Sequence, residues 1–407
     1  MPIPLRFFVS MIAVMTACGT AGAVIDPSID RSIDPSIDNV AVIRTARGLE
    51  TVSAGSGEVR LRVPDGVAAY DYSVFATTTY DGNRTEAALL DAAGAELARS
   101  SIAGELSARV VSGSGRLVAL TDPRASGTTP YLPAPKSRTR VVVMDSSGAH
   151  RDYLLEGNFE PEAFKLNDRE LFVIEYIPAL APNRYRVRRL RLGRGDVVPI
   201  GRLKGLAPDQ MNGTGRTQVP SPDGEELYTL YTQQSESGHE DGHHSGTAHA
   251  FVHLLNLRYS WAHCIDLPDE FASGTPDASA LAMDPSGDRL YVIEGSAGYI
   301  ASINPRRVRV IRSAELELVP SSPTVAAANG GRVFVSEAGG VAVIDADTLM
   351  VTDRWAVDGR IQGLHMSPDG RHLYVSLANE IVVVDRHNGE AIHSVIVEDV
   401  LALEDVG

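Results

Sequence analysis

The chain has 407 residues, of which 43% are hydrophobic and 22% charged, and its formal net charge is −15. This composition is sufficient for a large core, and the negative charge argues against a nucleic-acid partner, because phosphate binding needs clustered Lys and Arg. One basic run departs from this balance, at Arg184, Arg186, Arg188, Arg189, Arg191 and Arg194. We expect it to be the solvated face of a strand; the alternative is a docking stripe for an acidic partner.

Residues 1–23 are predicted to be an export signal. Arg6 provides the positively charged N-terminal region of the signal. Phe7–Ala17 is an apolar stretch too short to span a bilayer as a mature helix. Met15–Cys18 resembles a bacterial lipobox, which implies acylation of Cys18 and a membrane-anchored lipoprotein. The alternative is ordinary cleavage after Ala23, which gives a secreted protein. Both predictions place the protein outside the cytoplasm of a bacterium.

Residues 24–38 are predicted to be a tether. The hexapeptide Ile25–Asp30 is repeated at Ile33–Asp38, and short acidic units interrupted by Pro cannot build a core. A tether of this kind suits a lipid-anchored protein. If Cys18 is acylated or removed, Cys264 has no partner for an internal disulfide, and its apolar neighbours predict a buried, inert thiol.

From residue 39 onward the chain consists of short β runs separated by turn residues, and we predict a single all-β domain over residues 39–407. A tight turn followed by two apolar strands recurs at Ser221–Gly224, Asp284–Gly287, Ala328–Gly331 and Ser367–Gly370. The turn glycines at 287, 330 and 370 lie roughly 40 residues apart, the period of a four-stranded propeller blade. Trp261 and Trp355 are expected to pack between blades.

The repeat predicts a seven-bladed β-propeller, with six or eight blades as alternatives. The blades are expected to begin near residues 57, 108, 163, 217, 279, 323 and 362. The ring has to close so that no sheet edge is left bare, and Asn39–Thr45 is the candidate strand for closing it against the last blade.

The pattern Ser-Pro-Asp-Gly-x-x-Leu-Tyr-Val, followed by a Val-rich strand and Asp, resembles the YVTN-type repeats of bacterial surface and periplasmic propellers. The lactonase-like propellers share it. The resemblance covers roughly residues 217–397. It implies a fold and an extracytoplasmic location. It does not imply a reaction, because the motif carries no catalytic residue.

The repeat also predicts which face of the disc is functional. Strands of a blade run antiparallel, so the connections after the second and fourth strands share one face, opposite the tight turns. The long connections are all of these two kinds: 121–138, 178–183, 202–217, 233–248 and 268–279. Because long loops in a compact domain often carry function, we expect binding on this face, beside the central channel.

Six of the 11 histidines lie between His239 and His263. Neutral imidazole binds Zn, Cu or Ni, and we identify His239, His243, His244 and His249 as candidate metal ligands, with Glu240 and Asp241 near them. The alternative is a solvated polar insertion, and the spacing matches no standard zinc motif. His253 alternates with apolar residues and is expected to be a core histidine.

The sequence contains no nucleophile elbow, phosphate-binding loop or Cys pair, and it favours a non-enzymatic binding module over an enzyme. We therefore expect a monomeric cell-envelope or secreted propeller that binds a protein or a small molecule through its long loops. Two alternatives stay open: an extracytoplasmic metal-binding protein that uses residues 239–249, and a lactonase-like hydrolase with a metal or acidic cluster at the channel mouth.

Overall fold

The computed structural model of the chain describes residues 39–125, 133–202, 210–213, 217–234, 249–272, 274 and 276–407. The predicted signal segment, Cys18 and the predicted tether lie outside these residues. Among the residues described, no helix is long and apolar enough to cross a membrane.

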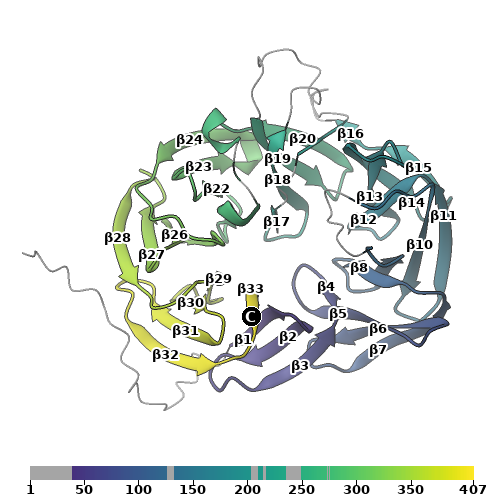
Figure 1. Cartoon of the computed structure of the whole chain (residues 1–407), viewed down its shortest axis with the longest axis horizontal. Coiled ribbons are helices and arrows are strands. Elements are labelled where there is room, and N and C mark those ends of the chain that lie inside the picture. Colours follow the sequence, from purple (N-terminus) through teal and green to yellow (C-terminus); the bar gives the residue numbers. More distant parts are fainter. Residues whose placement is uncertain are drawn as a thin grey trace, which may run out of the picture.

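The described residues form an all-β propeller whose sheets are arranged in a ring around a central axis (Figure 1). The innermost strands are β4 (Val67–Ala68), β8 (Ser107–Val111), β12 (Asn158–Phe164), β17 (Thr217–Pro220), β21 (Ser279–Met283), β25 (Ala326–Asn329), β29 (Gly363–Met366) and β33 (Val400–Val406). The second strands are β5 (Val74–Tyr80), β9 (Leu117–Thr121), β13 (Glu170–Ile177), β18 (Glu226–Gln234), β22 (Leu290–Glu294), β26 (Arg332–Glu337), β30 (His372–Ser376) and β1 (Val40–Thr45).

The third strands are β6 (Arg84–Asp91), β10 (Arg138–Asp145), β14 (Arg184–Arg191), β19 (His249–Asn256), β23 (Tyr299–Asn304), β27 (Gly340–Asp345), β31 (Glu380–Asp385) and β2 (Gly48–Ser53). The outer strands are β7 (Glu96–Ala103), β11 (His150–Glu156), β15 (Asp196–Pro199), β20 (Trp261–Asp266), β24 (Arg309–Glu315), β28 (Val351–Ala356), β32 (Ala391–Ile396) and β3 (Val59–Pro64). β16 (Gly201–Arg202) pairs in parallel with β20, and short 3-10 helices occur at Asp269–Phe271, Pro276–Ala278 and Pro305–Arg307.

The propeller has eight blades, so the fold class is confirmed and the count of seven is wrong; eight was one of the stated alternatives. The eighth blade combines β33 from the C-terminal end with β1, β2 and β3 from the N-terminal end. Residues 59–64, assigned from the sequence to the start of a first blade, are instead the outer strand of this closing blade. No turn joins β33 to β1, so the turn repeat could not reveal this blade.

β1 closes the ring as expected, but its partner is β33 and not the preceding blade. The two ends meet through a pair of backbone hydrogen bonds of 2.9 Å each, from Val40 N–H to Gly407 O and from Gly407 N–H to Val40 O. A sheet that takes strands from both ends of the chain removes the free edge of the ring.

Apolar clusters fill the spaces between neighbouring blades. Eight such clusters follow one another around the ring, and the one between the closing blade and the blade of β4–β7 contains Val42, Leu49, Val63 and Phe75. Trp355 belongs to the cluster beside β29–β32, and Trp261 packs against another, so both tryptophans lie between blades as predicted.

The repeated Ser-Pro-Asp-Gly turn joins innermost to second strands. In one copy Ser221 Oγ donates to Asp223 Oδ1 at 2.6 Å, and Gly224 N–H donates to Ser221 O at 2.8 Å. Gly224 has a φ of 66°, a conformation that glycine adopts without the steric cost of a side chain. The short turn leaves this face of the disc low.

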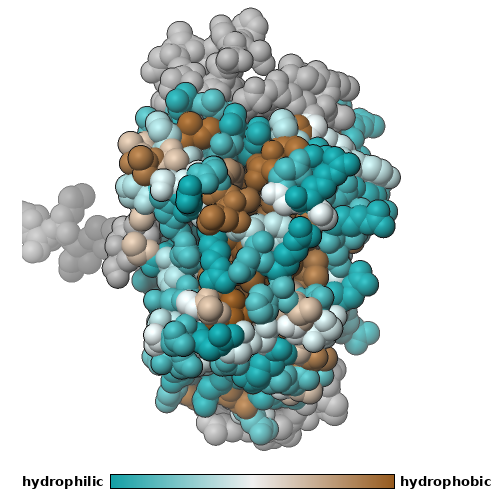
Figure 2. Space-filling view, turned by 90° about the vertical axis from the view of Figure 1, so that its right-hand side faces the viewer, coloured by the Kyte–Doolittle hydropathy of each residue, from teal (hydrophilic) through white to brown (hydrophobic). Residues whose placement is uncertain are grey.

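The rim of the disc is of mixed polarity. Figure 2 shows one side of it, where hydrophilic areas surround separate hydrophobic ones. The outer strands carry some exposed apolar side chains, among them Leu97 and Leu154, which is usual for a protein surface.

Candidate functional site

The strand order assigns every long connection to one face of the disc, which we call the long-loop face. The connections β9–β10, β13–β14 and β18–β19 follow second strands, and those before β17 and β21 follow outer strands. The four main strands of each blade pair antiparallel, so the ends of these connections lie opposite the tight turns. The predicted asymmetry of the two faces is therefore present in the fold.

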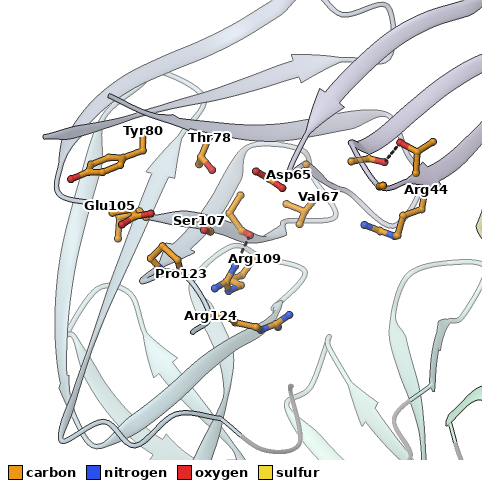
Figure 3. A pocket seen from close by; sticks show the side chains of 16 residues that line it. Arg44, Asp65, Val67, Thr78, Tyr80, Glu105, Ser107, Arg109, Pro123 and Arg124 are labelled. Carbon is orange, nitrogen blue, oxygen red and sulfur yellow. Dashed lines mark hydrogen bonds between the residues drawn. The ribbon is translucent and has the colours of Figure 1, made fainter. Parts of the chain in front are cut away.

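A cavity of about 560 Å³ opens on the long-loop face, at the junction between the closing blade and the next two blades (Figure 3). Its lining comes from long-loop-face connections and the adjoining strand ends. The lining residues are Arg44, Thr45, Ala46, Gly48, Asp65, Gly66, Val67, Thr78, Tyr80, Glu105, Leu106, Ser107, Ala108, Arg109, Pro123 and Arg124. The volume lies within the range of small-molecule sites, about 300–1,000 Å³.

Two arginines and one glutamate form the basic side of this cavity. Glu160 Oε1 lies 2.9 Å from Arg109 Nε and 2.7 Å from Arg124 Nη2. Arg109 also donates from Nη2 to Asp122 O at 2.9 Å and from Nη1 to Ala108 O at 3.4 Å. Two guanidinium groups share one carboxylate, so the group retains one positive charge beyond what Glu160 neutralises.

Burial lowers the pKa of Arg109, and the nearby Glu160 carboxylate opposes this effect. A guanidinium titrates so far above neutral pH that Arg109 stays a cation. The side chains of Arg109 and Glu160 are only 12% and 10% exposed, whereas that of Arg124 is 45% exposed. Arg109 is thus a fixed charge at the back of the cavity, and Arg124 is the guanidinium that solvent and ligands reach.

Acidic and hydroxyl groups form the rest of the polar lining. Asp65 lies on the connection from β3 to β4, and Glu105 lies on the connection from β7 to β8; both are exposed. In Figure 3 they lie with Thr78 and Tyr80 on the side of the cavity away from Arg109 and Arg124. A third arginine, Arg44, pairs through Nε with Glu404 Oε1 at 2.6 Å.

On the opposite face, Tyr70 of the connection between β4 and β5 lies close to the tight turns of other blades. A Cβ placed on Gly224 would lie 2.3 Å from Tyr70 Cζ, and one on Gly113 would lie 2.8 Å from Tyr70 Cε1. Tyr70 therefore reaches the tight turns of two other blades. It also lines a smaller cavity of about 150 Å³ there.

A second polar cluster lies near the ends of the innermost strands β29 and β33, on the same face as Tyr70. His365 Nε2 is 3.3 Å from Asp405 Oδ1, and His365 Nδ1 lies 2.9 Å from Met366 O. Burial raises the pKa of Asp405, as does the charge of Asp71, while His365 lowers it.

Three of the predicted metal ligands, His239, His243 and His244, lie outside the described residues, as do Glu240 and Asp241. His249 is the first residue of β19, where it pairs with Gln234 and packs against Phe251 at a ring-centroid distance of 5.9 Å. Among the described residues no three His, Cys, Asp or Glu side chains form a group that could hold a metal ion.

His253 and Cys264 lie in the core, as predicted. His253 is 3% exposed and meets Tyr231 edge-on at 6.1 Å between ring centroids. Cys264 is buried in the apolar cluster of the neighbouring strands, and burial raises the pKa of its thiol well above the usual range. The protonated thiol is a poor nucleophile.

Four arginines of the basic run, Arg186, Arg188, Arg189 and Arg191, pair within their own blade. Glu175 Oε2 lies 2.6 Å from Arg186 Nε and 3.5 Å from Arg188 Nε, and Arg189 reaches Glu170 at 3.2 Å. Arg191 pairs with Asp196. The solvated-strand prediction therefore describes this run better than a docking stripe.

The sequence did not single out the basic side of the cavity. Arg109, Arg124 and Glu160 are separated by 15 and 36 positions and belong to two inner strands and one connection. No local pattern links them. The ring alone brings them together.

No family model matches the chain, and no curated protein matches it. Among solved structures, AztD from Citrobacter koseri in its apo form is 11% identical, with 91% of this chain and 97% of that chain covered and a TM-score of 0.54. The dihydro-heme d1 dehydrogenase NirN in complex with DHE is 15% identical, with 92% and 76% covered and a TM-score of 0.53.

A periplasmic gluconolactonase from Pseudomonas aeruginosa, PpgL, is also similar: it is 15% identical, with 90% of this chain and 98% of that chain covered and a TM-score of 0.44. The chain is thus similar in fold to solved β-propellers. At these identities the likeness shows the fold alone.

Proposed function

We propose that the protein is an extracytoplasmic binding propeller that captures a transition-metal ion on its long-loop face, with His239, His243, His244 and His249 as ligands. The observation that carries this proposal is the position of the histidine-rich connection. Its two ends, Gln234 and His249, pair with each other at the ends of β18 and β19, on the face where the other long connections lie.

The chemistry of the side chains supports a transition metal. Four imidazoles lie within eleven positions, and neutral imidazole favours Zn, Cu or Ni over Mg or Ca. His249 starts a buried strand, so one end of the ligand set is fixed to the scaffold. Glu240 and Asp241 would add carboxylates that bind the ion or orient an imidazole.

The extracytoplasmic location is part of the proposal. It rests on residues 1–23, with Cys18 as the lipid-anchored residue if the lipobox-like segment is processed in that way. A metal-binding protein outside the cytoplasm meets metal ions before they enter the cell, which gives the histidine-rich connection a physiological use.

A lactonase-like hydrolase is the second candidate. It would need several carboxylates, His or Asn gathered at the channel mouth. The described residues there supply arginines with shared carboxylate partners, and they supply no group of metal-binding side chains.

Metal binding is tested on the mature chain purified without a histidine tag. We expect bound Zn, Cu or Ni in elemental analysis, or saturable binding of Zn²⁺ in competition with a chromophoric chelator. The double substitution His243→Ala and His244→Ala should weaken binding by more than about tenfold, because it removes two of four ligands. His387→Ala is the control, since His387 lies in a tight turn on the other face.

Absence of metal on purification together with absence of binding on titration would refute the proposal. So would an affinity that stays unchanged in the double variant. Binding should also weaken as the pH falls below about 6.5, where imidazoles take up protons and can no longer donate to the metal.

A further inference from the structure

The long-loop-face cavity of about 560 Å³ lies between the closing blade and the next two blades, whereas His249 belongs to the blade of β17–β20, and nothing in the proposed metal function uses the cavity. Three observations make it a binding site in its own right: its volume, a positive group held rigidly at its back, and unpaired acidic groups on its other side.

The positive group is rigid because its contacts fix it before any ligand arrives. Arg109 is held by two backbone carbonyls and by Glu160, and Arg124 is held by the same Glu160 oxygen. A guanidinium that is already oriented loses little conformational freedom on binding an anion. Arg124 uses Nη2 for Glu160, so further N–H donors are left for a carboxylate in the cavity.

The acidic side chains of the cavity, Asp65 and Glu105, differ from its arginines in their ion pairing. Among the residues that the structure describes, neither Asp65 nor Glu105 has an ion-pair partner, whereas Arg44, Arg109 and Arg124 each have one. The cavity therefore has a shared, incompletely neutralised positive side and a free negative side. A ligand of one sign would be attracted by one side and repelled by the other.

We propose that this cavity binds a short peptide with free termini. Its carboxylate would lie against Arg124 and Arg109, and its ammonium group would lie against Asp65 and Glu105. The hydroxyl of Ser107 would meet the peptide groups between them, and those of Thr78 and Tyr80 would lie on the ammonium side. The charges of a single amino acid are carried by one carbon, whereas a short peptide separates its charges and can reach both sides.

The test uses trialanine as the probe and the mature chain in low-salt buffer, with binding followed by calorimetry. Trialanine should bind, and blocking either terminus, by N-acetylation or by C-amidation, should weaken binding by about tenfold or more, since each removes one charge-assisted contact. Free alanine should bind more weakly than trialanine.

Two substitutions test which side of the cavity binds which terminus of the peptide. Arg124→Gln should weaken binding of trialanine and leave binding of the amidated peptide unchanged, because the lost partner is already absent from that peptide. Glu105→Gln should behave in the same way toward the acetylated peptide. Arg306→Gln is the matched control; Arg306 pairs with Asp288 at 3.0 Å at an exposed position on the other face, so binding should not change.

Failure of trialanine to bind would overturn the inference, as would binding that is indifferent to both blocking groups. Alanine binding as tightly as trialanine would also overturn it, since the site would then recognise a single residue. A thermal melt of each variant separates loss of binding from loss of fold. Because the probe contains no metal, these outcomes are independent of the metal proposal.

Discussion

At the scale of single residues, Tyr70 and Gly224 form a close contact between two blades. Gly224 has a positive φ, and it lies so close to the Tyr70 ring that a methyl group there would overlap Cζ. Tyr70 comes from the blade of β4–β7, whereas Gly224 comes from that of β17–β20, so the contact joins two blades that are not neighbours.

We therefore expect Gly224→Ala to lower the free energy of unfolding by about 1–3 kcal/mol, as overpacking usually does. Gly287→Ala is the control, because Gly287 has a similar φ of 71° but its added Cβ would meet only Pro222, 3.5 Å from Cδ and 3.8 Å from Cγ. Denaturant unfolding of both variants measures the difference. Equal losses in the two variants would show that Tyr70 does not occupy this position.

Asp405 is a carboxyl group whose charge state should respond to folding. Burial raises the pKa of its carboxyl group above the ordinary value, despite the nearby His365. Between the ordinary and the raised pKa the folded state binds more protons than the unfolded state. The contribution of Asp405 to stability therefore falls as the pH rises through that interval.

Relative to Asp405→Asn, the unmodified protein should accordingly lose stability as the pH rises from about 4 toward neutrality. Asp369 is the matched comparison, because Ser367 Oγ and the Arg371 N–H lower its pKa. Relative to Asp369→Asn, stability should instead fall as the pH drops through the lowered pKa. Thermal melts that extend below about pH 4 as well as up to neutrality would contradict the account if both slopes had the same sign.

At the scale of the strand, β33 is the element on which closure of the ring depends. It supplies the innermost strand of the closing blade and pairs with β1 along its length. Its buried side chains are Val400, Leu403 and Val406. Leu403 is 8% exposed and belongs to an inter-blade cluster, whereas Leu401 is 55% exposed.

Leu403→Ala should therefore cost about 2–5 kcal/mol of unfolding free energy, the usual range for a buried leucine. Leu401→Ala in the same strand should cost little, since surface substitutions usually change stability by less than about 0.5 kcal/mol. Denaturant unfolding compares the two variants directly. Similar small losses would mean that β33 does not close the ring.

The strands also show what could be predicted from the sequence. The turns at Gly224, Gly287 and Gly370 predicted the blades that begin with β17, β21 and β29 to within a residue, because each turn fixes where the innermost strand ends. The positions of the turns could not predict the closing blade. Its strands belong to opposite ends of the chain, and only pairing in three dimensions joins them.

The candidate sites could be predicted from the sequence only in part. The long-loop face followed from strand alternation alone, because connection length and strand order are local properties of the sequence. The Arg109, Arg124 and Glu160 group was missed, because each residue is an ordinary member of its own strand or connection. His249 was placed at the start of a buried strand, and the role proposed for it with His239, His243 and His244 remains a prediction.

At the scale of the whole molecule, the two faces of the disc differ in what they offer a ligand. The tight turns and Tyr70 occupy one face, while the long connections and the larger cavity occupy the other. A rigid ring of eight blades closed by both chain ends fixes these groups relative to one another. The central claim is that ligands, including a transition-metal ion, bind on the long-loop face.

The most direct test of this claim is an anomalous-scattering map from crystals of the mature chain grown with zinc. The account predicts a zinc peak on the long-loop face, next to His249 at the ends of β18 and β19. Absence of a peak, or a peak only on the other face, for example beside His365 and Asp405, would contradict it.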